Sequence, residues 1–201
     1  MFDRLFGAKT MDPAVAERVP PGQYVTEKFP VLHYGSVPTV DLATWDFRVF
    51  GEVDNPFTLT WQQFRELPRR TLHTDIHCVT RWSKLDTDWE GVAIQEILRL
   101  AQVRPTANFV VEHAEQGYTT NVPLEVLDDD DVILADTFGG EPLAAEHGYP
   151  LRLVLPKRYF WKSAKWIRGL EFVAQDRLGF WERYGYNNHA DPWKEERFSD
   201  D

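Results

Sequence analysis

The chain has 201 residues, of which 43% are hydrophobic and 14% aromatic, and its formal net charge is −10. A chain of this length and composition can bury one sizeable core and is unlike a disordered protein. The acidic balance argues against nucleic acid and anionic membrane surfaces as partners, because phosphate groups are bound by clustered Lys and Arg side chains.

The sequence also restricts the compartment and the kinds of metal site. It has no run of about eighteen apolar residues, so it predicts no membrane span. Its N-terminal region lacks the apolar segment and the twin-arginine pair of export signals, which favours a cytoplasmic protein. The single cysteine, Cys78, allows no internal disulfide and excludes cysteine-rich zinc sites and protein-ligated iron–sulfur clusters.

The predicted elements begin after an N-terminal arm. Residues 1–22 are expected to be loosely held, and they end in two prolines and a glycine. Alternating apolar and polar residues predict a strand over 45–53, and a second strand follows a turn at 57–59. Thr60 and Gln63 have the spacing of a capping box, which predicts a short helix directly after Thr60.

Short strands dominate the rest of the chain. Residues 71–80 alternate like a strand, residues 92–102 have the apolar spacing of an amphipathic helix, and a short helical turn is predicted at 123–127. Further strands are predicted over residues 109–112, 132–135, 151–155 and 167–173. This order predicts a mixed α+β fold. Without βαβ periodicity or a glycine-rich phosphate loop, a dinucleotide-binding fold has no support.

The C-terminal end is rich in Phe, Trp and Tyr. We expect one domain over residues 23–178 and an extension over residues 179–201. A cluster of large aromatic side chains is seldom left in water. The extension is therefore predicted to pack back on the domain.

The residues around Cys78 alone leave three interpretations of this cysteine open. It can be a buried and inert thiol, since free cysteine is among the most buried residue types. It can be a catalytic nucleophile whose pKa is lowered by His77 and Arg81. It can also be a soft thiolate ligand to a redox-active metal. The spacing of these residues does not separate the three.

A cationic loop follows an apolar strand in the C-terminal half. The strand carries Arg152 and ends at Pro156, and the loop contains Lys162 and Lys165. Cationic side chains and loop amides that converge on one place form a good anion pocket. The alternative is a solvated cationic surface on an acidic protein.

These segments together resemble a known family. The sequence Cys-Val-Thr-Arg-Trp-Ser from Cys78, followed by Trp-Glu-Gly-Val from Trp89, resembles the Cys-Val-x-x-Trp-Ser…Trp-x-Gly pattern of bacterial sulfoxide reductases. His147 begins a His-Gly-x-Pro-x-Arg motif that ends at Arg152, and Lys165 follows thirteen residues later. The chain is similar to the oxidoreductase molybdopterin-binding domain of sulfite oxidases, plant assimilatory nitrate reductases and bacterial methionine sulfoxide reductase catalytic subunits.

The resemblance covers roughly residues 30–175 and implies the sulfite oxidase molybdopterin-binding fold, with mixed β-sheets and short helices. It implies a molybdenum–molybdopterin cofactor (Mo-MPT) whose metal is ligated by Cys78. The cofactor contacts that it implies are His147 for the pterin, and Arg152, Ser163, Ala164 and Lys165 for the phosphate. It also places cofactor contacts at His33, Tyr34 and His113.

The implied activity is two-electron transfer of an oxygen atom to or from a small sulfur- or nitrogen-oxide substrate. Sulfite oxidases carry substrate-binding arginines where this chain has Leu32 and Ser83, so Arg81 becomes the candidate catalytic residue that contacts substrate. A small redox protein or a membrane subunit is implied as electron-transfer partner, because the chain has no haem or flavin motif. The alternatives are a molybdopterin-binding protein without turnover, a thiol enzyme that pairs Cys78 with His77, and an interaction domain.

Overall fold

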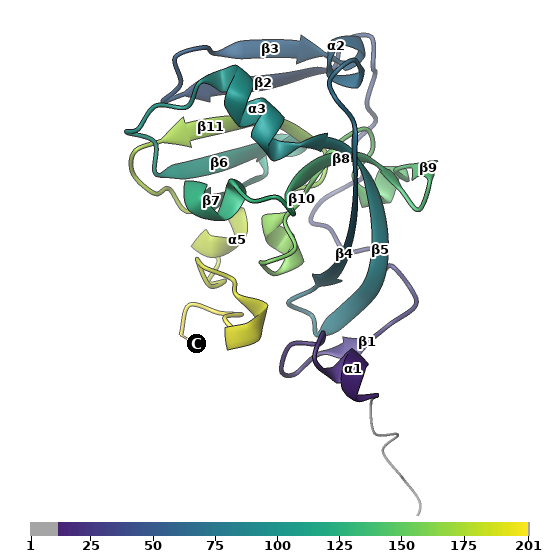
Figure 1. The fold of residues 1–201 in the computed structure, drawn as a ribbon. Helices are drawn as coiled ribbons and strands as arrows, with labels where there is room; N and C mark the ends of the chain where they lie inside the picture. Colours follow the sequence, from purple (N-terminus) through teal and green to yellow (C-terminus); the bar gives the residue numbers. More distant parts are fainter. Residues whose placement is uncertain (1–11, 201) are drawn as a thin grey trace, which may run out of the picture.

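Two mixed β-sheets make up the fold in a computed structural model, which describes residues 12–200 (Figure 1). Sheet B has the strand order β3 (Phe57–Thr60), β2 (Asp46–Gly51), β11 (Ile167–Val173), β6 (Phe109–Ala114) and β7 (Thr119–Pro123). Strands β2 and β11 run parallel, and the other neighbours run antiparallel. An early and a late strand of the chain thus lie side by side within this sheet.

Sheet A is built around the long strand β5 (Trp82–Ala93). Its strands are β1 (Tyr24–Val25), β5, β8 (Ile133–Phe138) and β10 (Arg152–Val154) in order, with β4 (Arg70–His77) paired to β5 and β9 (Glu141–Pro142) paired to β8. Strands β1 and β5 run parallel, and the other neighbours run antiparallel. The β4–β5 hairpin extends away from sheet B toward the N-terminal segment (Figure 1).

The helices are short. They are α1 (Pro13–Ala16), α2 (Trp61–Arg65), α3 (Ile94–Ala101), α4 (Leu124–Leu127), α5 (Phe180–Arg183) and the 3₁₀ turns η1 (Glu115–Gly117), η2 (Ala145–His147), η3 (Phe160–Lys162) and η4 (Pro192–Lys194). The predicted capping box of α2 is confirmed, because the side chains of Thr60 and Gln63 each accept a hydrogen bond from the other residue's backbone amide. Within residues 12–200, no helix has the length and hydrophobicity needed to cross a membrane.

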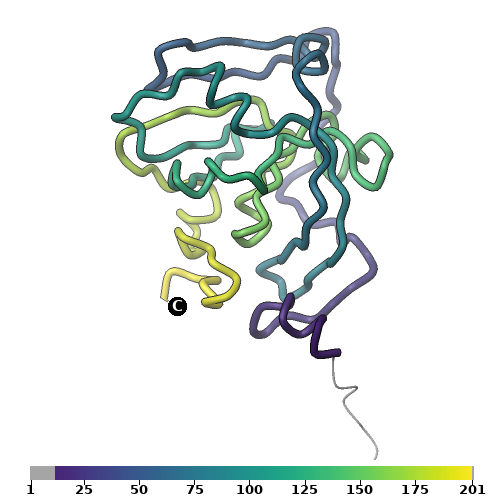
Figure 2. Tube along the Cα trace, viewed as in Figure 1, coloured from purple at the N-terminus to yellow at the C-terminus, as the bar shows by residue number. Residues whose placement is uncertain are grey.

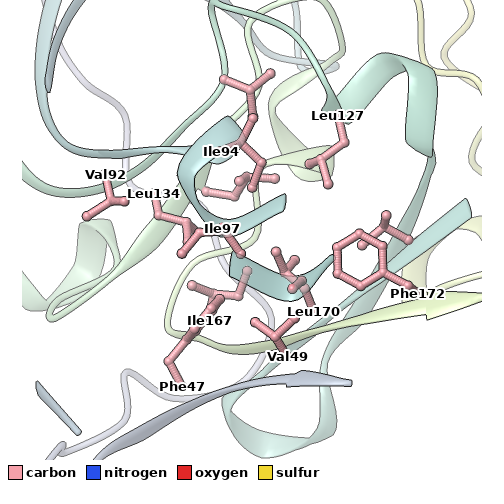
Figure 3. Packing of buried hydrophobic residues seen from close by; sticks show 14 of the residues in the cluster. Phe47, Val49, Val92, Ile94, Ile97, Leu127, Leu134, Ile167, Leu170 and Phe172 are labelled. Atoms are coloured by element: carbon pink, nitrogen blue, oxygen red, sulfur yellow. The ribbon is translucent and has the colours of Figure 1, made fainter. Parts of the chain in front are cut away.

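The larger hydrophobic core lies against sheet B and α3 (Figure 3). Ile94, Ile97 and Ala101 recur at helical spacing and are fully buried, so α3 presents one apolar face to the core. Figure 3 shows Ile97 close to Ile167 and Leu170 of β11. Each such side chain contributes roughly 1.5–3 kcal/mol when fully buried, so this core sets how α3 sits on the sheet.

A second core lies on the other face of β8 and β10. Leu134 and Leu153 belong to the larger core, whereas their neighbours Ile133 and Val154 belong to the second. This division follows from the two-residue period of a strand, and it explains why both strands are apolar on both faces. Cys78 belongs to the second core.

The largest difference from the sequence prediction is β5. No part of this strand was predicted, because the exposed Asp86 and Asp88 hide the alternation with the buried Thr87 and Trp89. The helix predicted over 92–102 begins at Ile94, since the two preceding residues complete β5.

The first part of the chain contacts the β4–β5 hairpin. Residues 1–11 of the expected arm lie outside the described residues. The remainder makes specific contacts, in contrast to a loosely held arm: the guanidinium of Arg18 binds the carboxylates of Asp75 on β4 and Asp86 on β5, each at 2.6 Å. The Arg18 side chain is 40% exposed, so solvent weakens both ion pairs.

The last part of the chain returns to the domain. Figure 2 shows the yellow C-terminal segment in the lower half of the view, on the same side of the molecule as the purple N-terminal segment. The backbone amide of Tyr159 donates to the carbonyl of Ala190 at 2.8 Å, which ties this segment to the loop before η3. The contacts of Glu182 and Arg197 described below tie it at two further points.

Candidate active site

A cavity of about 440 Å³ contains most of the residues singled out in the sequence. Five parts of the chain line it: the loop before β2, the turn after β4, η1 with Tyr118, the segment from η2 to Trp166, and α5 with the residues after it. The predicted site residues on its wall are His33, Tyr34, Cys78, His147, Arg152, Ser163, Ala164 and Lys165. Both sheets therefore contribute to one site.

Cys78 lies one residue past the end of β4, in the tight turn to β5. The turn is closed by two backbone hydrogen bonds, from Cys78 N to the carbonyl of Trp82 at 2.9 Å and from Arg81 N to the carbonyl of Cys78 at 3.0 Å. The Sγ atom is 3.2 Å from Oγ1 of Thr80, and the residue is 8% exposed.

Burial raises the pKa of the Cys78 thiol, while hydrogen bonds to Thr80 and the positive charge of Arg197 act in the opposite direction. A thiol with a raised pKa is a poor nucleophile at neutral pH, whereas a bound metal deprotonates it. The environment of Cys78 therefore favours metal ligation over nucleophilic catalysis.

His77 does not form a catalytic pair with Cys78. Its Nδ1 lies 2.8 Å from Oγ of Ser83, and it lies outside the group of residues that line the cavity. Burial lowers the pKa of His77 to about 4, so its ring is neutral at pH 7 and carries no charge that could lower the pKa of the thiol. Successive strand residues point to opposite faces, which accounts for this separation.

Arg152 is a buried cation that organises the loop around it. It is 2% exposed, and its guanidinium donates to the carbonyls of His147 at 2.9 Å and Ser163 at 3.1 Å. It also lies over the ring of Phe160 at 4.1 Å from the centroid. Burial lowers the pKa of Arg152 to about 9, so the side chain still carries its charge at neutral pH.

Lys165 joins two walls of the cavity. Its Nζ donates to the carbonyl of Leu32 at 2.8 Å and to that of Glu146 at 2.9 Å. Burial, together with the nearby charge of Arg152, lowers the pKa of Lys165 to about 7. An anion in the cavity would favour the charged form, so this ammonium is suited to hold a phosphate.

His147 lines the cavity, and Gly148 follows it in the chain. The ring of His147 stacks on Phe29, with centroids 3.9 Å apart and an interplanar angle of 4°. Burial and the charge of Arg152 lower the pKa of His147, so the ring is neutral. Gly148 has φ +115°, and a Cβ there would lie 3.1 Å from Cβ of Arg152 and 3.3 Å from Cα of Lys165. The motif therefore needs glycine at this position.

The backbone amides of Ser163 and Ala164 are used inside the protein. Ser163 N donates to the carbonyl of Phe160 at 3.2 Å, and Ala164 N donates to Oε2 of the buried Glu112 at 3.0 Å. Oγ of Ser163 accepts a hydrogen bond from Leu155 N at 3.0 Å. Because that bond leaves the hydroxyl proton for another acceptor, the Ser163 side chain can still donate into the cavity.

The structure leaves two predicted site residues outside the cavity. Nη1 of Arg81 lies 3.5 Å from the carbonyl of Gly22, away from the cavity wall. His113 on β6 pairs instead with Glu171 of β11, with 2.8 Å between Nε2 and Oε2. Neither residue is among those that line the cavity.

Lys162 also differs from the sequence prediction. It was expected to provide charge to an anion pocket, but its side chain is fully buried and its Nζ lies 2.7 Å from Oε1 of Glu182 on α5. The same oxygen accepts hydrogen bonds from Trp161 Nε1 and Thr120 Oγ1, both at 2.9 Å. The ion pair of Lys162 with Glu182 holds α5 against η3, and the Lys162 ammonium does not face the cavity.

The C-terminal aromatic residues form a wall that the motifs alone did not reveal. Phe180, Trp181 and Tyr186 line the cavity, and the ring of Phe180 lies 4.8 Å from that of the exposed Tyr34. Aromatic richness was the sequence signal for packing here.

The donor set of the cavity fits a molybdopterin cofactor. A thiolate is a suitable soft ligand for a redox-active metal, and Cys78 provides it on the cavity wall. Among residues 12–200 there is no cluster of three or more His, Cys, Asp or Glu side chains that could hold a metal ion. Lys165 and Arg152 place positive charge on the same wall, which a phosphate group would need.

The comparisons with known proteins agree with this geometry. The model of the oxidoreductase molybdopterin binding domain family matches residues 34–181, and the chain belongs to that family. The chain is 46% identical to the uncharacterized oxidoreductase YuiH of Bacillus subtilis, over 97% of this chain and 99% of that protein. It is 25% identical to sulfite oxidase of Arabidopsis thaliana, over 81% of this chain and 51% of that protein.

Two further comparisons support the fold. The chain is 24% identical to the protein-methionine-sulfoxide reductase catalytic subunit MsrP of Campylobacter jejuni, over 73% of this chain and 54% of that protein. The crystal structure of the sulfane dehydrogenase SoxCD from Paracoccus pantotrophus superimposes with a TM-score of 0.68 at 19% identity, covering 92% of this chain and 59% of that chain. The protein thus has the sulfite oxidase fold and is a molybdopterin-dependent oxidoreductase with Mo-MPT as its cofactor.

Proposed function

We propose that the protein catalyses two-electron oxygen-atom transfer to or from a small substrate of the sulfur-oxide or nitrogen-oxide type, with Cys78 as the protein ligand to molybdenum. The observation that carries this proposal is the position of Cys78. Its sulfur lies on the wall of the same cavity as Lys165 and Arg152. One cavity therefore offers a metal ligand at one place and a cationic phosphate site at another.

The protein's own residues would have distinct roles in this reaction. Mo-MPT, when bound, supplies the two-electron chemistry and the oxygen-atom exchange. Lys165 holds the phosphate through its ammonium, with the buried charge of Arg152 nearby. His147, neutral and held by stacking on Phe29, orients the pterin. The aromatic wall from α5 limits the access of water to the cavity.

The substrate side of the cavity favours a dipolar group over a strongly anionic one. The predicted contact Arg81 lies outside the cavity, and Leu32 lines it where sulfite oxidases carry an arginine. Arg152 and Lys165, the two cations on the wall, are held by backbone carbonyls of the cofactor loop. An uncharged oxide needs no further cation, so its binding fits this wall better than that of sulfite.

The electron-transfer partner belongs to the same proposal. A relative from Azospira oryzae, 28% identical over 88% of this chain, is named a putative protein-methionine-sulfoxide reductase subunit, YedZ1. That name supports a separate partner protein for electron exchange, which agrees with the expectation from the sequence. We also propose a cytoplasmic location, which a single reduced cysteine fits.

Elemental analysis tests the proposal when it is combined with absorption spectra and turnover. Protein from a molybdenum-replete host should contain about one molybdenum per chain and should reduce dimethyl sulfoxide or trimethylamine N-oxide with a chemical electron donor. Cys78→Ala should abolish turnover and alter the charge-transfer band. Full activity of Cys78→Ala would contradict the proposal. Bound molybdenum that cannot be reduced or oxidised would instead favour a binding protein without turnover.

A further inference from the structure

The turn that carries Cys78 is held by residues from both ends of the described chain. The carbonyl of Cys78 accepts a hydrogen bond from Nε2 of Gln23 at 3.0 Å, in addition to the one from Arg81 N. The next carbonyl, that of Val79, accepts a hydrogen bond from Nη1 of Arg197 at 2.8 Å. Two consecutive carbonyls of the turn are therefore held by side chains from distant segments.

Arg197 is itself fixed in place. It is 4% exposed, its Nη2 donates to the carbonyl of Pro21 at 3.3 Å, and its guanidinium lies 4.8 Å from the centroid of the Tyr159 ring. Its own carbonyl accepts a hydrogen bond from Asn187 N at 3.1 Å. A planar guanidinium held on several sides loses little further freedom when it binds a carbonyl, so it can define the position of the turn.

Both residues lie outside the part of the chain that the family model matches. That match spans residues 34–181, whereas Gln23 precedes it and Arg197 follows it. The turn with the candidate metal ligand is therefore completed by two segments that the family pattern does not contain. Sequence motifs around Cys78 give no indication of either contact, because the residues lie 55 and 118 positions from their partners.

We propose that Arg197 is a positioning residue for Cys78, which fixes the metal-ligating turn through the Val79 carbonyl and places a buried positive charge beside the sulfur. This inference rests on the proposed role of Cys78 as the molybdenum ligand. A buried cation next to the ligand stabilises the more electron-rich state of the centre. Arg197 thus raises the reduction potential of the bound centre, while Gln23 contributes to position without charge.

Variants of the cofactor-loaded protein separate these effects. Arg197→Met should change the electron paramagnetic resonance spectrum of Mo(V) and lower the midpoint potential. Arg197→Lys keeps the charge but loses the planar set of N–H donors. Its midpoint potential should therefore lie close to that of the wild type. Gln23→Ala should alter the spectrum and leave the potential near that of the wild type. Glu195→Gln is the matched control, because it removes only the partly exposed carboxylate 3.6 Å from Arg197.

Hydrogen exchange provides a readout that does not depend on the metal. In metal-free protein, Arg197→Met should speed exchange of the Arg81 amide, which closes the turn onto Cys78, by about five- to tenfold, as expected for the loss of one hydrogen bond. Glu195→Gln should leave this rate unchanged.

The possible results are distinguishable. A folded Arg197→Met protein with the wild-type molybdenum content, Mo(V) spectrum, potential and Arg81 exchange rate would overturn the inference. Should Arg197→Met not fold, wild-type spectra and exchange rates in both Arg197→Lys and Gln23→Ala would overturn it equally. A wild-type protein that binds no molybdenum would instead contradict the proposed function, and faster Arg81 exchange in Arg197→Met would still support the role of Arg197 in holding the turn.

Discussion

Lys162 of η3 and Glu182 of α5 form an ion pair of 2.7 Å with both side chains fully buried. The pair links the loop that carries Ser163 and Lys165 to the helix that carries Phe180 and Trp181. Breaking a buried ion pair leaves one charge without its partner, whereas replacing both members removes the problem. This relationship gives a sharp test of stability.

We expect Lys162→Met to destabilise the fold by about 3–5 kcal/mol, because it leaves the carboxylate of Glu182 buried without its cation. The double variant Lys162→Met with Glu182→Met should recover much of this loss, as two apolar side chains need no partner. Urea unfolding followed by circular dichroism measures both. Equal destabilisation in the single and double variants would contradict the role assigned to the pair.

The charge of Lys165 should make cofactor retention depend on pH. Its pKa is lowered to about 7 by burial and by Arg152, and a bound phosphate favours the protonated form. Binding therefore takes up a proton above pH 7, and cofactor retention weakens as the pH rises above about 7, by up to about tenfold per pH unit. The rate of cofactor loss on dialysis, followed by pterin fluorescence, measures this.

Lys165→Arg is the control for that experiment. Arginine keeps its proton throughout this range, so the steep pH dependence of cofactor loss should flatten. The same slope in wild type and Lys165→Arg would assign the dependence to another group.

Gly148→Ala should reduce both stability and molybdenum content. The added Cβ would meet Cβ of Arg152 at 3.1 Å, on a backbone with φ +115° that L-residues rarely adopt. We expect a cost of about 1–3 kcal/mol, measured by thermal unfolding. Gly140→Ala is the matched control, because Gly140 also has positive φ but has open space around its Cβ position. A similar loss of molybdenum in both variants would show that space around Gly148 is unimportant.

Leu32→Arg should increase the affinity of the site for anions. Leu32 lines the cavity and is half exposed, so an arginine there can reach the ligand without burying an unpaired charge. One charge-assisted hydrogen bond contributes about 1.5–3 kcal/mol, which corresponds to sulfite binding at least about tenfold tighter. Calorimetric titration of sulfite into loaded protein tests this, with Leu32→Met as the uncharged control. Unchanged affinity would place the substrate elsewhere.

Much of the candidate site could be predicted from short segments of the sequence. The turn with Cys78, the motif from His147 to Arg152, and Lys165 each lie in short segments whose order is recognisable, and the structure brings them to one cavity. The capping box of α2 could be predicted in the same way, because Thr60 and Gln63 are three positions apart.

Contacts between distant residues could not be predicted in the same way. Lys162 appeared as a free cation because its partner Glu182 lies twenty positions along the chain. The pairing of His113 with Glu171 spans 58 positions, and it holds that histidine away from the cavity. The second pairing depends on the register of β6 against β11, which the periodicity of a single segment does not specify.

The alternation of residues along β8 and β10 has a consequence for how the protein fails under stress. Because adjacent residues of one strand belong to the two cores, unfolding of either core also removes packing contacts from the other. Heating should therefore unfold both cores in a single cooperative transition. The thermal stability of the cavity and that of the whole fold should then change together, whichever of the two cores a substitution alters.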